Sequence, residues 1–266
     1  MKTLERGNEM RRTLIAALIV AAAVVMAAPQ TFNAQERQRG TGDLPEIEEI
    51  RQTYELAQGA KVEVSGINGP VDIETHYGDT AEIHIVRSAR TREDLNYRRI
   101  NISHTRDGLV VAGERDDRDR RNVQVRHRVT MKIPRQVTLT AQSINGRATV
   151  GEIEGPVHLR SINGRLEVGQ AVDYAELASI NGRVTMTIAR LGERGIKMNN
   201  INGAIDLRFL DGLNADLDVE YINGNVRSDL PNVELQKLSR SSFRGRIGAG
   251  GTPLTMSHIN GSITIR

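Results

Sequence analysis

Six histidines are the first candidates for chemistry in this chain of 266 residues. None is followed by a second histidine three or four residues later, and no His-Glu-x-x-His motif occurs. The chain also lacks the Gly-x-Ser-x-Gly motif of a serine nucleophile. The sequence therefore predicts no catalytic residue, no metal site and no cofactor. The histidines are expected to be scattered over the surface, and they are His76, His84, His104, His127, His158 and His258.

Closely spaced carboxylates are the second candidates. Glu152 and Glu154 lie two residues apart, as do Asp216, Asp218 and Glu220, so that on a strand each set projects from one face. Paired acids of this kind can bind Ca²⁺ or act in general acid–base catalysis. A strand that faces solvent also needs a polar residue at every second position. We therefore expect solvent-facing strands and keep a polysaccharide-active enzyme as an alternative.

Three arginines recur at one position of a repeated motif. Arg147, Arg165 and Arg183 each follow the sequence Ser-Ile-Asn-Gly. If the motifs stack, these side chains form a basic column that can face an anionic polymer or surface. The alternative is that they only keep the protein soluble and protect it against edge pairing.

The motif itself is the most specific signal in the chain. Ile-Asn-Gly occurs seven times, and the asparagines from 145 to 223 are separated by 18, 18, 21 and 21 residues. A period near 20 is typical of solenoids and related repeat proteins. Phe243-Arg244-Gly245 is interpreted as a degenerate copy, followed by a last step of 16 residues. The seven copies predict a structural turn ladder of Asn68, Gly69, Asn145, Gly146, Asn163, Gly164, Asn181, Gly182, Asn202, Gly203, Asn223, Gly224, Asn260 and Gly261.

The residues around each copy alternate as strands do. The positions five and three residues before the isoleucine are apolar in all seven copies, and apolar residues recur two and four positions after the glycine of most copies. Each repeat is therefore predicted to be an incoming strand, a tight Asn-Gly corner with left-handed backbone angles, and an outgoing strand. Two-residue hairpins are the alternative. The fixed period favours a stack in which equivalent asparagines bond to one another about 4.8 Å apart.

The predicted fold is all-β: a β-solenoid or β-helix-like stack of short strands with an irregular antiparallel N-terminal β region. Only residues 91–98 offer a short helix, and residues 47–57 fit either a helical turn or a leading strand. Four segments are expected: a signal peptide (1–34), a linker (35–54), the irregular β region (55–134) and the repeat solenoid (135–266), the last two forming one body.

The N-terminus predicts export. Arg11 and Arg12 precede an apolar run from Leu14 to Ala28 that ends in small residues. We expect cleavage after this run, and an uncleaved membrane anchor is the alternative. The protein is then periplasmic, secreted or at the surface of a bacterial cell, and it meets the membrane only through this segment if the segment is retained.

Composition limits the partners. Cysteine is absent, so disulfides and thiolate sites are excluded, and aromatic residues make up only 3% of the chain. The formal charge of +3 gives no reason to expect nucleic acid. The chain stops on the strand-like segment 262–266 without a polar cap, which predicts self-association through an exposed last coil.

These features together resemble the bacterial putative adhesins, a family of β-strand-repeat proteins of unknown function. The resemblance covers residues 55–266 and rests on the Ile-Asn-Gly corners and the strand alternation. It implies an all-β, solenoid-like cell-envelope protein with an adhesive or scaffolding role. We expect an exported, non-enzymatic module that binds an envelope polymer, a glycan or another envelope protein. A polysaccharide-active β-helix enzyme and a membrane-anchored envelope-stress accessory are the alternatives.

Overall fold

The computed structural model describes seven stretches of the chain, which are residues 44–115, 123–171, 173–188, 190–210, 212, 214–231 and 233–266. The expected signal peptide and the first part of the linker lie outside them. Within these stretches, 21 strands form two mixed sheets, and there is one short helix. This confirms the all-β prediction. No helix in this part of the chain is long and apolar enough to cross a membrane.

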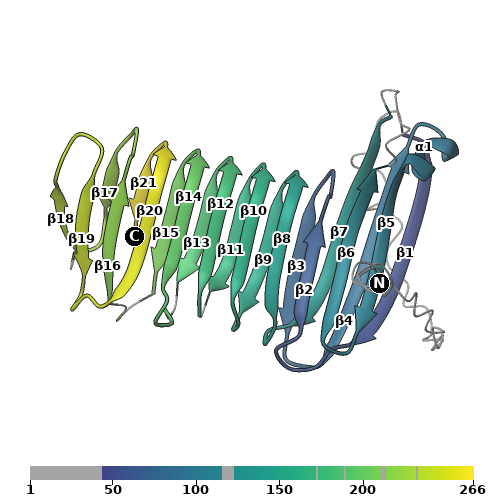
Figure 1. The fold of residues 1–266 in the computed structure, drawn as a ribbon, viewed down its shortest axis with the longest axis horizontal. Helices are drawn as coiled ribbons and strands as arrows, with labels where there is room; N and C mark the ends of the chain where they lie inside the picture. Colours follow the sequence, from purple (N-terminus) through teal and green to yellow (C-terminus); the bar gives the residue numbers. More distant parts are fainter. Residues whose placement is uncertain are drawn as a thin grey trace, which may run out of the picture. The chain divides into compact units, whose positions relative to one another are not determined.

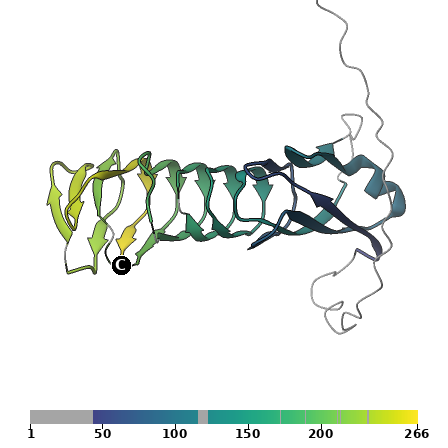
Figure 2. The ribbon, with the colours of Figure 1, turned by 90° about the horizontal axis from the view of Figure 1, so that it is seen from below.

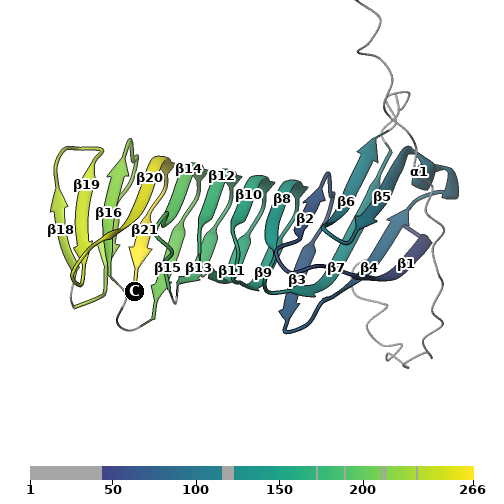
Figure 3. The same cartoon turned by 60° about the horizontal axis from the view of Figure 1, so that its bottom comes forward.

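The two sheets face each other as two layers of strands (Figures 1, 2 and 3). The ten-stranded sheet contains, in spatial order, β1 (Glu46–Glu55), β4 (Thr80–Ala89), β7 (Val125–Pro134), β3 (Val71–His76), β9 (Ala148–Ile153), β11 (Leu166–Ala171), β13 (Val184–Ile188), β15 (Ile205–Phe209), β21 (Ile263–Ile265) and β17 (Val226–Ser228). The eleven-stranded sheet contains β18 (Val233–Lys237), β19 (Phe243–Ile247), β16 (Ala215–Glu220), β20 (Thr252–Asn260), β14 (Ile196–Asn202), β12 (Ala175–Asn181), β10 (Val157–Asn163), β8 (Thr138–Asn145), β2 (Lys61–Ser65), β6 (Gly108–Arg115) and β5 (Arg98–Thr105).

From β8 to β15 the chain alternates between the sheets, one strand in each. We call an incoming strand, its Asn-Gly corner and the outgoing strand a coil. Strands of successive coils pair in parallel and in register, so that Ile162 lies beside Ile144 on one side and Ile180 on the other. The strands that flank one corner belong to different sheets, which excludes the hairpin alternative for these corners.

The core lies between the two layers and is aliphatic. The isoleucine of every Ile-Asn-Gly motif is at most 4% exposed, as are the apolar residues five and three positions before it. Burying one such side chain contributes about 1.5–3 kcal/mol. Apolar residues at equivalent positions therefore stack in register, and each coil adds to one continuous core.

The expected order of the last coils is wrong. On one side, strand β20 pairs with β14, which places Ile259 beside Ile201. On the other side, β20 pairs with β16, which places Met256 beside Val219. The last coil of the sequence thus lies between the fifth and sixth repeats, as the yellow strands β20 and β21 show in Figure 1.

The proposed degenerate corner at Arg244 is also wrong. Arg244 lies inside β19, which runs antiparallel to β16 and pairs with β18 on its other side. Phe243 and Ile247 of this strand are 8% and 1% exposed, so their apolar side chains cover the end of the core. The step of 16 residues to Asn260 therefore does not measure a coil.

The last strand is not at an edge, contrary to the expectation. β21 lies between β15 and β17. Arg266 donates from Nε to Oδ1 of Asp206 at 2.8 Å and from Nη2 to Oδ2, which fixes the end of this strand. These bonds from Arg266 also lower the pKa of the Asp206 carboxyl. The reason given for self-association therefore does not hold.

The N-terminal region combines both kinds of pairing. β1–β4, β4–β7 and β5–β6 are antiparallel, as expected. However, β2 pairs in parallel with β6 and β8, and β3 with β7 and β9, so the region continues both sheets of the repeat. Residues 46–54, assigned to the linker, belong to β1 and pair with β4, which favours the leading strand over the helical turn.

The short helix lies where the sequence predicts it. α1 (Arg92–Tyr97) begins with a capping box between Thr91 and Asp94. Its end is stabilised by Arg87 of β4, which is 6% exposed and donates to the carbonyls of Leu95 and Arg98. These bonds satisfy carbonyls that a helix C-terminus leaves without intrahelical partners.

Candidate functional site

The corners form one continuous edge of the stack. In β10 the buried Ile162 is followed by the exposed Asn163, the last residue of the strand. Because β11 begins at Leu166, only Gly164 and Arg165 connect this strand of one sheet to the next strand in the other sheet. We call this edge, made of the residue before each isoleucine, the asparagine, the glycine and the next residue, the corner edge.

The seven asparagines lie in a single row along the corner edge. Each bond runs from Nδ2 of one asparagine to Oδ1 of the next, at 3.1–3.3 Å. The bonds connect Asn223 to Asn260, Asn260 to Asn202, Asn202 to Asn181, Asn181 to Asn163, Asn163 to Asn145, and Asn145 to Asn68. Aligned amides polarise one another, so such a row is stiffer than isolated pairs.

The first asparagine is supported by β7 instead of another copy of the motif. Asn68 donates from Nδ2 to the carbonyl of Val125 at 2.9 Å, and its backbone N–H points to Nδ1 of His127 at 3.3 Å. His127 is only 4% exposed, so it is not the surface histidine that the sequence suggests. Burial, with a smaller effect of the Arg87 charge, lowers the pKa of His127 to about 4, although the Arg98 backbone acts in the opposite direction.

The glycines of the corners are required by close approach of the coils. A Cβ on Gly164 would lie 2.2 Å from the carbonyl oxygen of Gly146, and one on Gly182 would lie 2.0 Å from that of Gly164. The φ angles of these two glycines are both 155°, at the limit of the left-handed region. The steric need for glycine therefore comes mainly from the neighbouring coil.

The left-handed residue of each corner is the one before the isoleucine, which corrects the expectation of left-handed angles at Asn-Gly. Its φ is 54–60° in six coils, and Gly66 has 67° at the same place in the first. It adds one residue between two inward-facing positions, as a β-bulge does. The non-glycine residues at this position are Ser143, Ser161, Ser179, Asn200, Tyr221 and His258.

The three arginines occupy adjacent coils, on the side of the corner edge next to the ten-stranded sheet. Backbone bonds of 2.9 and 2.8 Å join Ala148 to the carbonyl of Arg165 and Leu166 to that of Arg183. The side chains of Arg147 and Arg165 are 55% and 61% exposed. We call Arg147, Arg165 and Arg183 the arginine row.

The arginine row has acidic neighbours two residues further along the strands of the ten-stranded sheet. Arg147 lies 3.3 Å from Asp72, and Arg165 lies 3.8 Å from Glu167. The bond from Arg266 is the main cause of the lowered pKa of Asp206, and the charge of Arg183 lowers this pKa to a smaller extent. Exposed ion pairs of this kind contribute about 0–1 kcal/mol, so the guanidinium groups can exchange them for a ligand.

Two of the candidate catalytic carboxylates, Glu152 and Asp216, are engaged in other contacts. Glu152 pairs with Arg135 at 2.8 Å, and Glu154 follows the end of β9 instead of lying on it. Asp216 accepts a bond from the Gly251 N–H at 3.0 Å. Among the described residues, no group of three or more histidines and carboxylates could hold a metal ion.

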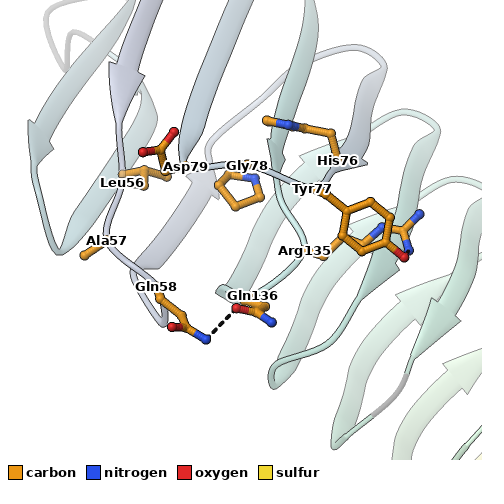
Figure 4. A pocket seen from close by; sticks show the side chains of 10 residues that line it. Leu56, Ala57, Gln58, His76, Tyr77, Gly78, Asp79, Arg135 and Gln136 are labelled. Atoms are coloured by element: carbon orange, nitrogen blue, oxygen red, sulfur yellow. Dashed lines mark hydrogen bonds between the residues drawn. The ribbon is translucent and has the colours of Figure 1, made fainter.

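A shallow pocket of about 200 Å³ lies at the opposite ends of the strands, where three turns meet (Figure 4). Tyr77 is 80% exposed beside it, and the Arg135 guanidinium carbon lies 4.1 Å from the centre of the Tyr77 ring. Gln58 donates to Gln136, another lining residue, at 2.5 Å. Two pairs of lining side chains, Gln58 with Gln136 and Arg135 with Tyr77, are thus bonded to each other.

Sequence reasoning missed the left-handed residue of each corner and the contact between Tyr77 and Arg135. The left-handed residue was detectable, because apolar residues five and three positions before the isoleucine imply one extra residue before the corner. No residue pattern indicates that Tyr77 packs on Arg135, 58 positions later.

No model of a known protein family matches the chain, and no curated protein matches it. Several solved structures align with it. A putative cell adhesion protein from Clostridium sporogenes ATCC 15579 is 11% identical, with 83% of this chain and 99% of that chain covered and a TM-score of 0.43.

A putative adhesin from Bacteroides fragilis NCTC 9343 is 11% identical, with 84% and 99% covered and a TM-score of 0.33. A putative adhesin from Parabacteroides merdae ATCC 43184 is 11% identical, with 82% and 96% covered and a TM-score of 0.29.

Proposed function

We propose that the described part of the chain is a β-solenoid that acts as a non-enzymatic binding module of an exported cell-envelope protein. Its binding surface is the corner edge, and its ligand is an extended anionic polymer of the envelope. In this role the protein is an adhesin or a structural component that holds the polymer. The observation that carries the proposal is the arginine row, three exposed cationic side chains on consecutive coils.

The spacing of this row suits a polymer. Neighbouring strands lie about 4.8 Å apart, so the three arginines present a cation at each such step. A flexible anionic chain that lies along the edge replaces weak ion pairs with Asp72 and Glu167 by several simultaneous contacts. Contacts on one chain reinforce one another because the later ones are intramolecular.

The asparagine row gives this surface its stiffness. Seven asparagines span six steps, or about 29 Å at the strand spacing. A rigid edge loses little conformational entropy when it binds, which favours affinity from contacts that are individually weak. Export is supported by Arg11, Arg12 and the apolar run 14–28, which lie outside the described residues.

The test is titration calorimetry of the purified protein with polygalacturonate, an acidic polysaccharide, at low and high salt. Arg147→Gln/Arg165→Gln/Arg183→Gln should weaken binding at least tenfold, and high salt should weaken binding to the wild type because exposed charges are screened. Arg90→Gln/Arg106→Gln/Arg240→Gln is the matched control, because it removes the same charge from exposed arginines elsewhere. Equal loss in the two variants would contradict the proposal.

A further inference from the structure

Two aromatic side chains stand at one end of the corner edge. In spatial order, the residues before the isoleucines are Gly66, Ser143, Ser161, Ser179, Asn200, His258 and Tyr221. The first five are small or carry short polar groups. The last two carry aromatic rings, in a chain with five Tyr, three Phe, no Trp and six His.

The two rings are stacked. The Tyr221 and His258 ring centroids lie 4.9 Å apart with an interplanar angle of 18°. Tyr221 is 63% exposed, and His258 is exposed as well. Neither ring contributes to the aliphatic core, which is closed at these coils by Ile222 and Ile259, at 4% and 1% exposure.

The backbone beneath the rings is fixed. Both residues have φ 54°, a conformation that is uncommon for residues other than glycine and unusual for bulky ones. The N–H of Asn223 donates to the Ile259 carbonyl at 2.8 Å, which holds the two corners together. Serine meets the same backbone requirement in three other coils, so the corner itself does not require an aromatic ring.

The surroundings of the rings are polar. The amides of Asn223 and Asn260, joined at 3.1 Å, follow the two rings by two residues along the corner edge. An exposed flat apolar surface beside amide groups suits a sugar ring, whose C–H face packs on an aromatic ring while its hydroxyl groups bond to amides. Tyrosine and histidine lose little side-chain entropy on binding, because each has two rotatable side-chain torsions.

We propose that Tyr221 and His258 form a platform for one sugar ring of a polysaccharide that lies along the corner edge. This inference rests on the proposed function and names its ligand as a glycan, as opposed to any polyanion. The coil of His258 lies two strand spacings, about 10 Å, from the coil of Arg183, so a short glycan segment reaches both.

The experiment compares two anionic polymers, polygalacturonate and polyphosphate, which lacks sugar rings. The variant Tyr221→Ser/His258→Ser introduces the residue that other coils carry at this position, so it should keep the fold and its melting temperature. We expect it to weaken polygalacturonate binding at least fivefold in calorimetry and to leave polyphosphate binding within twofold. The arginine-row variant should weaken binding of both polymers.

The two proposals fail in different ways. If only the arginine-row variant loses polygalacturonate, the aromatic platform is overturned and the proposed function stands. If only the aromatic variant loses it, the platform stands and the arginine row is overturned. If the wild type binds neither polymer, both are overturned. As a second readout, polygalacturonate should shift the NMR signals of the His258 ring, and an unchanged ring spectrum at saturation would overturn the platform.

Discussion

Asn260 donates from Nδ2 to Oδ1 of Asn202 at 3.1 Å, although 58 residues separate them in the chain. The bond exists because β20 and β21 lie between the fifth and sixth repeats. The corner edge is therefore continuous in space but not in sequence order. The stacked rings of Tyr221 and His258 depend on the same arrangement, since it makes their coils neighbours.

Substitution of a corner glycine should strongly destabilise the fold. In Gly164→Ala the new Cβ meets the Gly146 carbonyl oxygen at 2.2 Å, so the two coils must separate. We expect the free energy of unfolding in urea to fall by about 3 kcal/mol, since overpacking of this kind costs 1–3 kcal/mol or more. In the control Gly108→Ala, the Cβ lies 3.5 Å from its nearest neighbour and the loss should be small. Equal losses would contradict the close approach of the coils.

Substitutions at the left-handed position before each isoleucine should change the free energy of unfolding according to how well the new residue tolerates a positive φ. Ser161 has φ 54°, where a β-branched residue is a genuine outlier. Ser161→Val should lower the free energy of unfolding by about 2 kcal/mol, within the 1–3 kcal/mol typical of such backbone strain. Ser161→Gly should be close to neutral, because relief of strain offsets the greater freedom of glycine in the unfolded chain. A valine variant as stable as the glycine variant would show that the bulge is absent.

Stability should fall in mild acid because of His127. Its pKa is about 4 in the folded protein against 6.5 ordinarily, so the unfolded chain binds the proton more readily. The folded state therefore loses stability as the pH falls from 6.5 towards 4. A pKa difference of one unit corresponds to about 1.4 kcal/mol, which gives a total loss of about 3 kcal/mol.

Urea unfolding across this pH range checks the effect. His127→Gln cannot be protonated and should flatten the curve above pH 4.5. Bonds with Arg51, Arg160 and Arg266 lower the carboxyl pKa values of Glu49, Glu176 and Asp206, respectively, so their stabilisation is lost mainly below 4.5. Parallel curves for wild type and variant would contradict the assignment to His127.

Much of the repeat could be predicted from sequence because its signals are local. The alternation around each Ile-Asn-Gly motif reports which side chains face inward, and a fixed period implies that equivalent residues stack. The asparagine row and the arginine row follow directly from in-register stacking. The short helix was also detectable, because residues 91–98 lack the strand alternation of the segments on either side.

The order of the coils could not be predicted, because nothing in the sequence distinguishes an inserted coil from a terminal one. Phe243-Arg244-Gly245 fits the period by position, yet its apolar residues Phe243 and Ile247 serve an antiparallel strand that closes the core. The buried state of His127 likewise depends on β7 lying beside the first corner, a contact between residues 59 positions apart.

Insertion of the last coil between the fifth and sixth repeats is the central claim, since the order of the corner edge at its end and the stacking of Tyr221 on His258 depend on it. The chain has no cysteine, so pairs can be introduced cleanly. Ser257 lies beside Asn199 on one side and Glu220 on the other, which places Asn199 and Glu220 two strand spacings, about 10 Å, apart. Two cysteines more than about 7 Å apart at Cα cannot be bridged without backbone movement.

The decisive measurement is therefore disulfide formation in two double variants under mild oxidation, followed by mass spectrometry of the proteolysed protein. Asn199→Cys/Ser257→Cys should cross-link within the chain, and Asn199→Cys/Glu220→Cys should remain reduced. The reverse result, a 199–220 disulfide and free thiols at 199 and 257, would show that the coils stack in sequence order.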